Sequence, residues 1–559
     1  MEQQRTLLII ALFIVMFLMW NAWQRDYVMP KPVPTTSQVT PEQVIENKNN
    51  EVPTASNTVA PMTSHTTAPV MSQPKMARSQ RIHVRTDFMD VELDSRGGDV
   101  RQVGLLKYPV SSKEKDKPLL LMNDQPPHLF IAQDGFAAKK QTANGALTSA
   151  PNQNTVYQAA ATDYVLSTGE NEIVVPFTWT SPQGVKFIKR YRFNRSKYLI
   201  RVEHEIQNPT QREWQGNLYQ QLQRMPIPKA DQQRFIHTYT GGVIYSNQHK
   251  YEKIDFDDMK KHNLSREIKG GWAAMIQHYF LGAWIPNNSQ GFNYYSRVFD
   301  NDRYVIGMTS PTYTVAAGQS RTLESKLFIG PKLQTHLESI APGLELTVDY
   351  GYLTFIAKPI FWLLRTIHSI VHNWGWSIIF LTLTIKLAFY KLSETSYKSM
   401  ANMRRMQPRM KALKERFGDD RAQMNKALME LYKKEKINPL GGCLPIVVQI
   451  PVFISLYWVL LESVELRQAP FMLWIQDMST PDPYFILPII MGITMLIQQR
   501  LNPTPLDPIQ AKLMMVLPFA FGIFFSFFPA GLVLYWVVNN TLSISQQWYI
   551  TRVVIGKEK

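Results

Sequence analysis

The feature that most constrains this chain is a series of long apolar segments, one of which contains a charge. The run Ser377–Leu392, SIIFLTLTIKLAFYKL, is interrupted by Lys386. A cation inside a membrane helix costs about 2.5–3.5 kcal/mol on insertion scales, so Lys386 marks a candidate functional site. Helical spacing places Thr382 one turn before it, and Phe389 and Tyr390 one turn after it. The alternative is that the lysine snorkels to the nearer membrane surface, because a second lysine follows five residues later.

Composition narrows the class of protein. The chain has 559 residues, 45% of them hydrophobic, with apolar runs near both ends, which is typical of a membrane protein with a large soluble part. The only cysteine is Cys443, so no intramolecular disulfide can form. The sequence contains no P-loop, no G-x-S-x-G, no H-E-x-x-H and no cluster with metal-ligand spacing. We therefore expect neither an enzyme nor a cofactor or metal site.

The N-terminal region is predicted to be an anchor and a tether. Thr6–Trp23 is apolar, has membrane-spanning length and is bracketed by Arg5 and Arg25. It lacks the short core and A-x-A-like site of a cleaved signal peptide, so residues 1–27 are predicted to be an uncleaved transmembrane signal anchor. Residues 28–80 are rich in Pro, Thr and Ser and are predicted to be a disordered tether.

Residues 81–340 show the alternation of β-strands. The clearest pairing joins Ile173–Thr180 to Val185–Phe193 through the turn Ser-Pro-Gln-Gly, and a second turn leads into Tyr198–Ile206. Further strands are predicted at 82–85, 89–93, 100–106, 303–308 and 322–329. We expect one large antiparallel β domain of two packed sheets, and we find no catalytic dyad in it.

Residues 341–373 are predicted to form an interfacial amphipathic helix. Tyr352–His372 has an apolar face, and Lys358, Arg365, His368 and His372 recur opposite it. Such a helix suits the membrane surface rather than a span, and packing against a protein core is the alternative.

Residues 394–437 are predicted to be a helical hairpin. Lys398–Lys436 carries 12 Lys/Arg against 5 Asp/Glu, and a break falls at Gly418-Asp419-Asp420. Apolar residues recur at spacings of three and four, as in a coiled-coil seam. The methionines among them either fill that seam or offer an adaptable surface to apolar segments. They are Met403, Met406, Met410 and Met424.

The rest of the chain is a membrane core. Including the lysine-bearing run, residues 374–559 are predicted to hold five spans, the last four being Gly441–Leu461, Tyr484–Ile497, Leu513–Phe528 and Leu532–Ile550. With the N-terminal anchor this makes six. Lysine and arginine concentrate in the hairpin, the 500–512 loop and the C-terminal tail, while the 462–483 loop is acidic. The positive-inside rule then places both termini and the hairpin in the cytoplasm and the β domain outside it.

Two features of this core point to function. Two of the predicted spans have only about 14 to 16 residues, fewer than the roughly 20 that cross a bilayer, so local membrane thinning is expected. The spans also carry polar groups, which together would form a wet, positively charged groove. Ordinary hydrogen bonds between helices are the alternative for each of them. They are Thr382, Lys386, Gln449, Asn539 and Asn540.

Several segments resemble the YidC-type membrane protein insertases of Gram-negative bacteria. They are NPLGGCLPIVVQIPVF (Asn438–Phe453), SVELRQAPF (Ser463–Phe471) and FPAGLVLYW (Phe528–Trp536), and the order of domains also agrees. The resemblance covers essentially the whole chain. It implies insertion and folding of inner-membrane proteins, alone or with the Sec translocon and its accessory subunits, without nucleotide or metal. It also implies a periplasmic β-sandwich, and a hairpin that engages nascent substrate, the ribosome or targeting factors. Membrane lipids are the remaining expected partner, and no specific nucleic-acid sequence is expected.

The resemblance also assigns residue roles. It implies that Lys386 is the groove cation, where the family generally has arginine. Lysine keeps the charge but lacks the planar fork. Lys391 is a second departure, since relatives often have proline there. Substrate contacts are implied at Thr382 and along an apolar slide formed by Ile450, Phe453, Tyr535 and Trp536.

Two other classes of protein compete with an insertase. A transporter or channel would favour inverted repeats, and the sequence shows no internal repeat. An intramembrane hydrolase with Lys386 as base needs a neighbouring serine. Ser377 and Ser393 lie nine and seven residues away along the chain, so this class is disfavoured.

Overall fold

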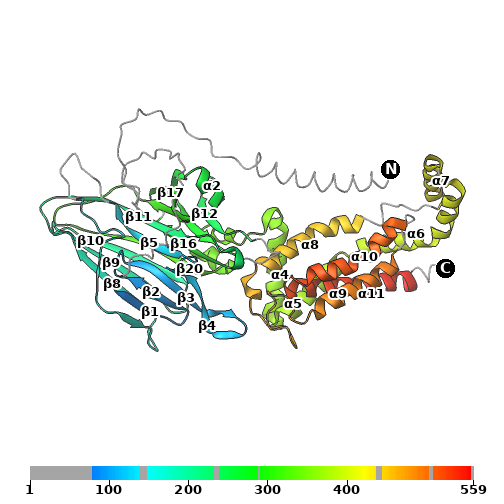
Figure 1. Ribbon diagram of the computed structural model, residues 1–559, viewed down its shortest axis with the longest axis horizontal. Coiled ribbons are helices and arrows are strands. Elements are labelled where there is room, and N and C mark those ends of the chain that lie inside the picture. Colours follow the sequence, from blue (N-terminus) through cyan, green and yellow to red (C-terminus); the bar gives the residue numbers. More distant parts are fainter. Residues whose placement is uncertain are drawn as a thin grey trace. The chain divides into compact units, whose positions relative to one another are not determined.

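The computed structural model describes residues 79–137, 148–231, 238–287, 290–418, 420–435, 444–502 and 508–554. The predicted anchor at 1–27 and nearly all of the predicted tether at 28–80 lie outside the described residues, as does Cys443. Within them, a β-rich region is followed by a helical region, as predicted (Figure 1).

The first sheet has eleven strands, and most of its pairs are antiparallel. Its main path runs β14-β17-β18-β11-β5-β3-β2-β1-β7, where β1 and β7 pair in parallel, and β4 and β19 pair with β3 and β11. The strands are β1 (Arg81–Arg85), β2 (Met89–Asp94), β3 (Asp99–Ser111), β4 (Glu114–Met122), β5 (Phe130–Ala137), β7 (Asp163–Val165), β11 (Trp214–Arg224), β14 (Ser265–Lys269), β17 (Gly291–Phe299), β18 (Arg303–Thr309) and β19 (Tyr313–Val315).

The second sheet has nine strands in the order β13-β12-β15-β16-β20-β10-β9-β8-β6. They are β6 (Gln158–Ala159), β8 (Glu172–Thr180), β9 (Lys186–Asn194), β10 (Leu199–Gln207), β12 (Gly241–Ser246), β13 (Lys250–Ile254), β15 (Gly271–Ile276), β16 (Phe280–Pro286) and β20 (Ser320–Pro331). Strands β8 and β9 pair antiparallel from Glu172↔Asn194 to Thr180↔Lys186, so the hairpin predicted from the sequence is confirmed.

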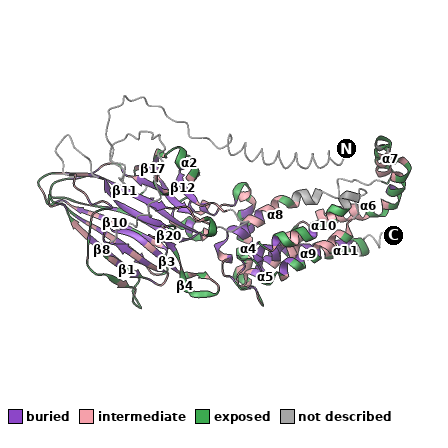
Figure 2. Cartoon of the chain, in the orientation of Figure 1, coloured by how far each residue is buried: buried purple, intermediate pink, exposed green. Residues whose placement is uncertain are grey.

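Burial follows the alternation that predicted these strands. In β9 and β10 every second residue is buried, because one face of each strand packs into the core. Figure 2 shows buried residues concentrated along the strands of both sheets. The fully buried tryptophans are Trp214, Trp272 and Trp284. The prediction of two packed antiparallel sheets is thus confirmed for this region.

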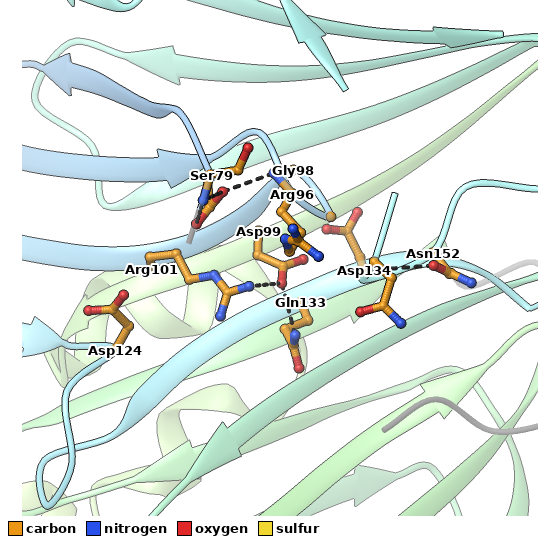
Figure 3. A network of polar contacts seen from close by, with 12 residues as sticks. Ser79, Arg96, Gly98, Asp99, Arg101, Asp124, Gln133, Asp134 and Asn152 are labelled. Carbon is orange, nitrogen blue, oxygen red and sulfur yellow. Dashed lines mark hydrogen bonds and ion pairs between the residues drawn. The ribbon is translucent and has the colours of Figure 1, made fainter. Parts of the chain in front are cut away.

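A buried polar network crosses the first sheet (Figure 3). Asp99 pairs with Arg101 at 3.0 Å and accepts a hydrogen bond from Gln133 at 2.8 Å. Gln221 donates to Gln133 at 3.0 Å and accepts from Tyr295 at 2.7 Å. Buried polar groups need such partners, because an unmade hydrogen bond in the interior is costly.

A second buried cluster is centred on Asp134. Its carboxylate pairs with Lys189 at 2.5 Å and with His204 at 2.6 Å, and all three side chains are almost fully buried. Burial alone would raise the pKa of Asp134, but the Lys189 ammonium and the His204 hydrogen bond outweigh it and lower that pKa. Burial lowers the pKa of His204, against the opposing effect of Asp134. The carboxylate therefore stays ionised inside the domain.

The helical region contains the elements that position the candidate site. They are α4 (Thr354–Val371), α5 (Trp374–Ala388), α6 (Tyr390–Phe417), α7 (Arg421–Lys434), α8 (Leu444–Glu462), α9 (Ile486–Leu501), α10 (Pro508–Phe525) and α11 (Ala530–Tyr549). Helix α11 packs against α5, α8 and α9, while α4 packs against α5 and α8. Shorter helices are α2 (Phe256–Lys261) and α3 (Gln334–Ile340), with single turns at 229–231, 344–347, 351–353, 464–466 and 550–554.

The apolar run that contains Lys386 is not one continuous helix. Helix α5 ends at Ala388 and α6 begins at Tyr390, with a bend of 69° between them. The expectation that Tyr390 follows Lys386 by one turn of the same helix was therefore wrong. Phe389 leaves the helical conformation, with φ −94° and ψ 13°, and so breaks the regular spacing.

Among the described residues, no single helix combines the length and the hydropathy of a membrane span. The bent pair α5–α6 passes that test by length and composition. Shorter apolar helical stretches are Gln449–Glu462, Ile486–Leu501 and Lys512–Phe525. The six spans and their orientation therefore stay predictions.

Candidate functional site: a polar groove among the helices

The Lys386 side chain lies between two helices that are far apart in sequence. Its Nζ donates a hydrogen bond of 2.7 Å to Oγ of Ser543 on α11. Lys386 is half-buried and Ser543 is buried. Ser543 in turn donates to the carbonyl of Asn539, one turn earlier, at 2.7 Å. The lysine is therefore held inside the bundle rather than directed along its own helix.

A small cavity adjoins the lysine. It is lined by Ile385 and Lys386 of α5, Phe389 at the break, Leu392 and Ser393 of α6, and Gln449 of α8. The break after Ala388 turns the start of α6 so that these residues of α5 and α6 line one space. The cavity is apolar on several sides, which strengthens electrostatic interactions with the single ammonium group.

The predicted groove residues do not all meet at this cavity. Gln449 lines it and donates to Asn539 Oδ1 at 3.2 Å, which ties α8 to α11. Asn540 is buried and donates instead to Thr494 of α9 at 3.3 Å. Thr382 is buried and donates to the carbonyl of Ile378 on its own helix at 2.7 Å. Lys386, Gln449 and Asn539 thus form one polar set, whereas Asn540 and Thr382 bond elsewhere.

Three of the four predicted slide residues, Phe453, Tyr535 and Trp536, form an aromatic cluster between α8 and α11. The ring centroids of Phe453 and Trp536 are 4.6 Å apart, and those of Phe453 and Tyr535 are 5.9 Å apart. Phe453 and Trp536 are half-buried and Ile450 is 48% exposed, whereas Tyr535 is only 3% exposed. Because Tyr535 is buried, it is the one of the four whose position suits packing between the helices rather than contact with a substrate.

The hairpin formed by α6 and α7 contains the predicted methionines. Met406 and Met410 are buried, and the Tyr432 hydroxyl contacts the Met410 sulfur at 4.0 Å. Met403 and Met424 are half-buried. Asp420 caps α7 by accepting hydrogen bonds from the backbone N–H groups of the second and third residues that follow it. Helix α6 ends at Phe417 and α7 begins at Arg421, so the predicted break between the two helices is confirmed.

The charge of Lys386 has no acidic partner in the part of the chain that the structure describes. The charged pairs found there do not include it, and its described hydrogen-bond partner is a neutral hydroxyl. Nor do the described residues bring together three His, Cys, Asp or Glu side chains that could hold a metal ion. The site offers a cation, hydroxyl and amide groups and aromatic rings. Ser543 supplies the serine beside Lys386 that the sequence did not reveal, but Lys386 donates to it and its own proton is donated to the Asn539 carbonyl, so the pair is not bonded as a nucleophile and its base. This arrangement suits binding rather than covalent chemistry.

Sequence reasoning missed Ser543. The only available signal was its spacing, because it lies four residues after Asn539 and seven after Trp536 on one face of a helix. The serines considered as neighbours of Lys386 were those near it in sequence. Spatial proximity across 157 residues could not be read from that spacing.

A β-rich domain followed by apolar helices around a half-buried lysine is typical of a membrane protein with a polar site inside its helical part. Comparison with known proteins specifies the family. Residues 81–363 match the family described as the YidC periplasmic domain, and residues 366–558 match the family described as 60Kd inner membrane protein.

Full-length relatives agree with these matches. A protein named membrane protein insertase YidC from Methylococcus capsulatus is 52% identical over 96% of this chain and 95% of its own length. Proteins of the same name from Thioalkalivibrio sulfidiphilus and Pseudomonas aeruginosa are 49% and 45% identical, over 99% and 100% of this chain and 98% and 100% of their own lengths. The chain belongs to the YidC family of membrane protein insertases.

Proposed function

We propose that this protein inserts and folds newly made membrane proteins in the inner membrane of a Gram-negative bacterium. It acts alone or with the Sec translocon, and uses no nucleotide, metal or covalent step. The groove takes up a short polar segment of the substrate, while an apolar segment leaves along Phe453 and Trp536 into lipid. Family membership supports the activity, and the geometry of the cavity supports the mechanism.

The observation that carries the mechanism is the placement of Lys386. A half-buried ammonium lines a cavity, bonds a hydroxyl of α11, and has no carboxylate partner among the described residues. A charge held in apolar surroundings attracts an opposite charge much more strongly than it would in water. An acidic residue in the polar tail of a substrate is therefore the group that this cavity suits best.

Helix length supports a thinned bilayer around the groove. Helix α9 has 16 residues and α10 has 18, so they extend about 24 and 27 Å, less than the roughly 30 Å hydrocarbon core. Both carry exposed apolar side chains, including Ile489, Ile493, Phe519 and Ile523. These suit contact with lipid, and a short apolar belt is accommodated by local thinning.

The remaining assignments complete this proposal. Both termini and the α6–α7 hairpin lie in the cytoplasm, where the basic hairpin meets the ribosome or targeting factors. The β domain lies in the periplasm, and α4 lies at the membrane surface. Helix α4 supports that placement because Phe355, Trp362 and Ile370 are 67–75% exposed. Lys358 and Arg365 are exposed as well.

The test is insertion into proteoliposomes that contain only this protein. The substrate has one apolar segment and a short N-terminal tail with one aspartate, and protease protection scores translocation of the tail. The native protein should translocate the tail, Lys386→Arg should retain activity, and Lys386→Ala should lose most of it. Activity that survives Lys386→Ala would overturn the groove mechanism and leave thinning and the slide.

A transporter or channel remains the competing class, and accessibility distinguishes it. In a Cys443→Ser background, a thiol reagent added from the cytoplasmic side should react with Lys386→Cys, whereas the same reagent from the periplasmic side should not. Reaction from both sides would indicate a continuous path and contradict the insertase mechanism.

A further inference from the structure

We propose that Ser543 is a positioning residue for Lys386, which keeps the ammonium beside the cavity where an acidic substrate tail would enter. The Ser543 hydroxyl holds the ammonium beside the cavity and leaves two of its N–H donors for an incoming acid. This inference rests on the proposed function, because it deepens the role of the same groove.

The hydrogen bonds around Ser543 define its role. Its hydroxyl donates to the Asn539 carbonyl at 2.7 Å, so its proton is committed to its own helix. A lone pair then remains to accept from Lys386 Nζ, also at 2.7 Å. Because Ser543 is only 3% exposed, water does not compete readily for these positions.

The number of N–H donors on the Lys386 ammonium determines how many remain to bind a substrate. An ammonium group has three N–H donors, and one of them is used by Ser543. Within the described ranges no other protein acceptor is bonded to Lys386, and the cavity beside it is lined by Ser393, Gln449 and apolar side chains. A neutral hydroxyl orients the ammonium without neutralising it. A carboxylate would supply both the missing charge and the missing acceptors.

Lysine depends on such a partner more than arginine does. Its point charge sits on a flexible four-carbon stem, whereas the guanidinium of arginine is a rigid planar fork with five donors. Without Ser543, the Lys386 stem would be free to turn the ammonium away from the cavity. The charge would still be present but would no longer be held where the tail passes.

The test compares Ser543→Val with Ser543→Thr, which have nearly the same shape but differ by the hydroxyl. Two substrates are used, identical except that the tail carries Asp or Asn. Ser543→Val should lower translocation of the Asp tail about tenfold, the size expected for losing one hydrogen bond to a charged group. It should leave the Asn tail unchanged, and Ser543→Thr should behave as the native protein with both tails.

Two further variants separate the possible outcomes. Lys386→Met sets the floor for the Asp tail, and adding Ser543→Val to it should cause no further loss. If Lys386→Met fails while Ser543→Val works normally, the positioning role is wrong and the groove mechanism stands. If neither variant matters, the groove mechanism itself fails. An equal loss for both tails would show that Ser543 only supports packing and would overturn this inference.

Discussion

Replacing Lys189 by methionine should destabilise the β domain more than any surface change. Lys189 Nζ pairs with Asp134 at 2.5 Å and donates to the carbonyl of Gly98 at 2.8 Å. Without it, the Asp134 carboxylate keeps, among the described residues, its bonds to His204 and to the Tyr191 hydroxyl. Breaking one partner out of a buried ion pair costs about 3–5 kcal/mol, because a charge is left without its counter-charge.

Hydrogen–deuterium exchange on the whole protein in detergent measures this cost. Peptides from β9 and β10 report opening of the domain, and 3–5 kcal/mol corresponds to exchange faster by between about a hundredfold and a few thousandfold. Lys117→Met is the matched control, since that lysine pairs with Glu114 on the surface and should change nothing.

A second variant tests whether the unpaired charge is the cause. Lys189→Met combined with Asp134→Asn removes both charges, so it should cost less than Lys189→Met alone. If the double variant is less stable than the single one, or if Lys189→Met accelerates exchange less than fivefold, the cluster owes its stability to packing. Either result would refute the attribution of this stability to the buried charge pair.

Three further predictions concern other sites. Burial raises the pKa of Asp99 to about 6, although the positive charge of Arg101 opposes this shift. Because the folded protein then holds this proton more tightly than the unfolded chain does, the free energy of unfolding should fall as the pH rises from about 4 to 6. Asp99→Asn should remove that fall, as measured by exchange in β3 across this pH range. Gly375→Ala should lower the melting temperature in detergent, because its Cβ would lie 2.0 Å from the Phe471 ring, whereas Gly522→Ala, whose nearest neighbour would lie at 3.7 Å, should not. Asp420→Ala should cost about 1 kcal/mol and accelerate exchange at the start of α7, because its carboxylate caps that helix.

Alternating burial explains why much of the β domain could be predicted. The hairpin of β8 and β9 has one buried face and a turn with proline and glycine, so period and turn chemistry agree. Strand β5 was missed because all eight of its residues are buried, including Gln133 and Asp134. Polar side chains in a strand ordinarily indicate a solvent-facing side, and in β5 they face other polar side chains inside the domain.

The groove could be predicted only in part, because the partners of its polar side chains depend on how the helices pack. Lys386 and Gln449 were identifiable because a polar group in an apolar helix needs a partner. Which partner it takes depends on helix packing, and that is a long-range property. Thr382 illustrates the difference, since its hydroxyl is satisfied by the carbonyl of Ile378 on its own helix.

Among the described residues, the side chains of Lys189, Lys332 and Lys386 form hydrogen bonds or ion pairs in the interior of the protein. They differ in whether a carboxylate neutralises the charge. Lys189 is paired with Asp134, and Lys332 is paired with Glu462 at 3.3 Å and bonded to the Thr347 carbonyl at 3.1 Å. Lys386 has a hydroxyl and no carboxylate. Two of these charges are neutralised within the fold, and the third is not.

This difference leads to opposite expectations for the same substitution. Lys386→Met removes an uncompensated charge and leaves no carboxylate of the described residues unpaired, and Ser543 keeps its bond to the Asn539 carbonyl. The melting temperature in detergent should therefore stay unchanged or rise, while translocation of the acidic tail is lost. Lys332→Met should lower the melting temperature, because Glu462 would stay buried without its partner. A fall for Lys386→Met as large as that for Lys332→Met would mean that Lys386 supports the fold rather than a substrate.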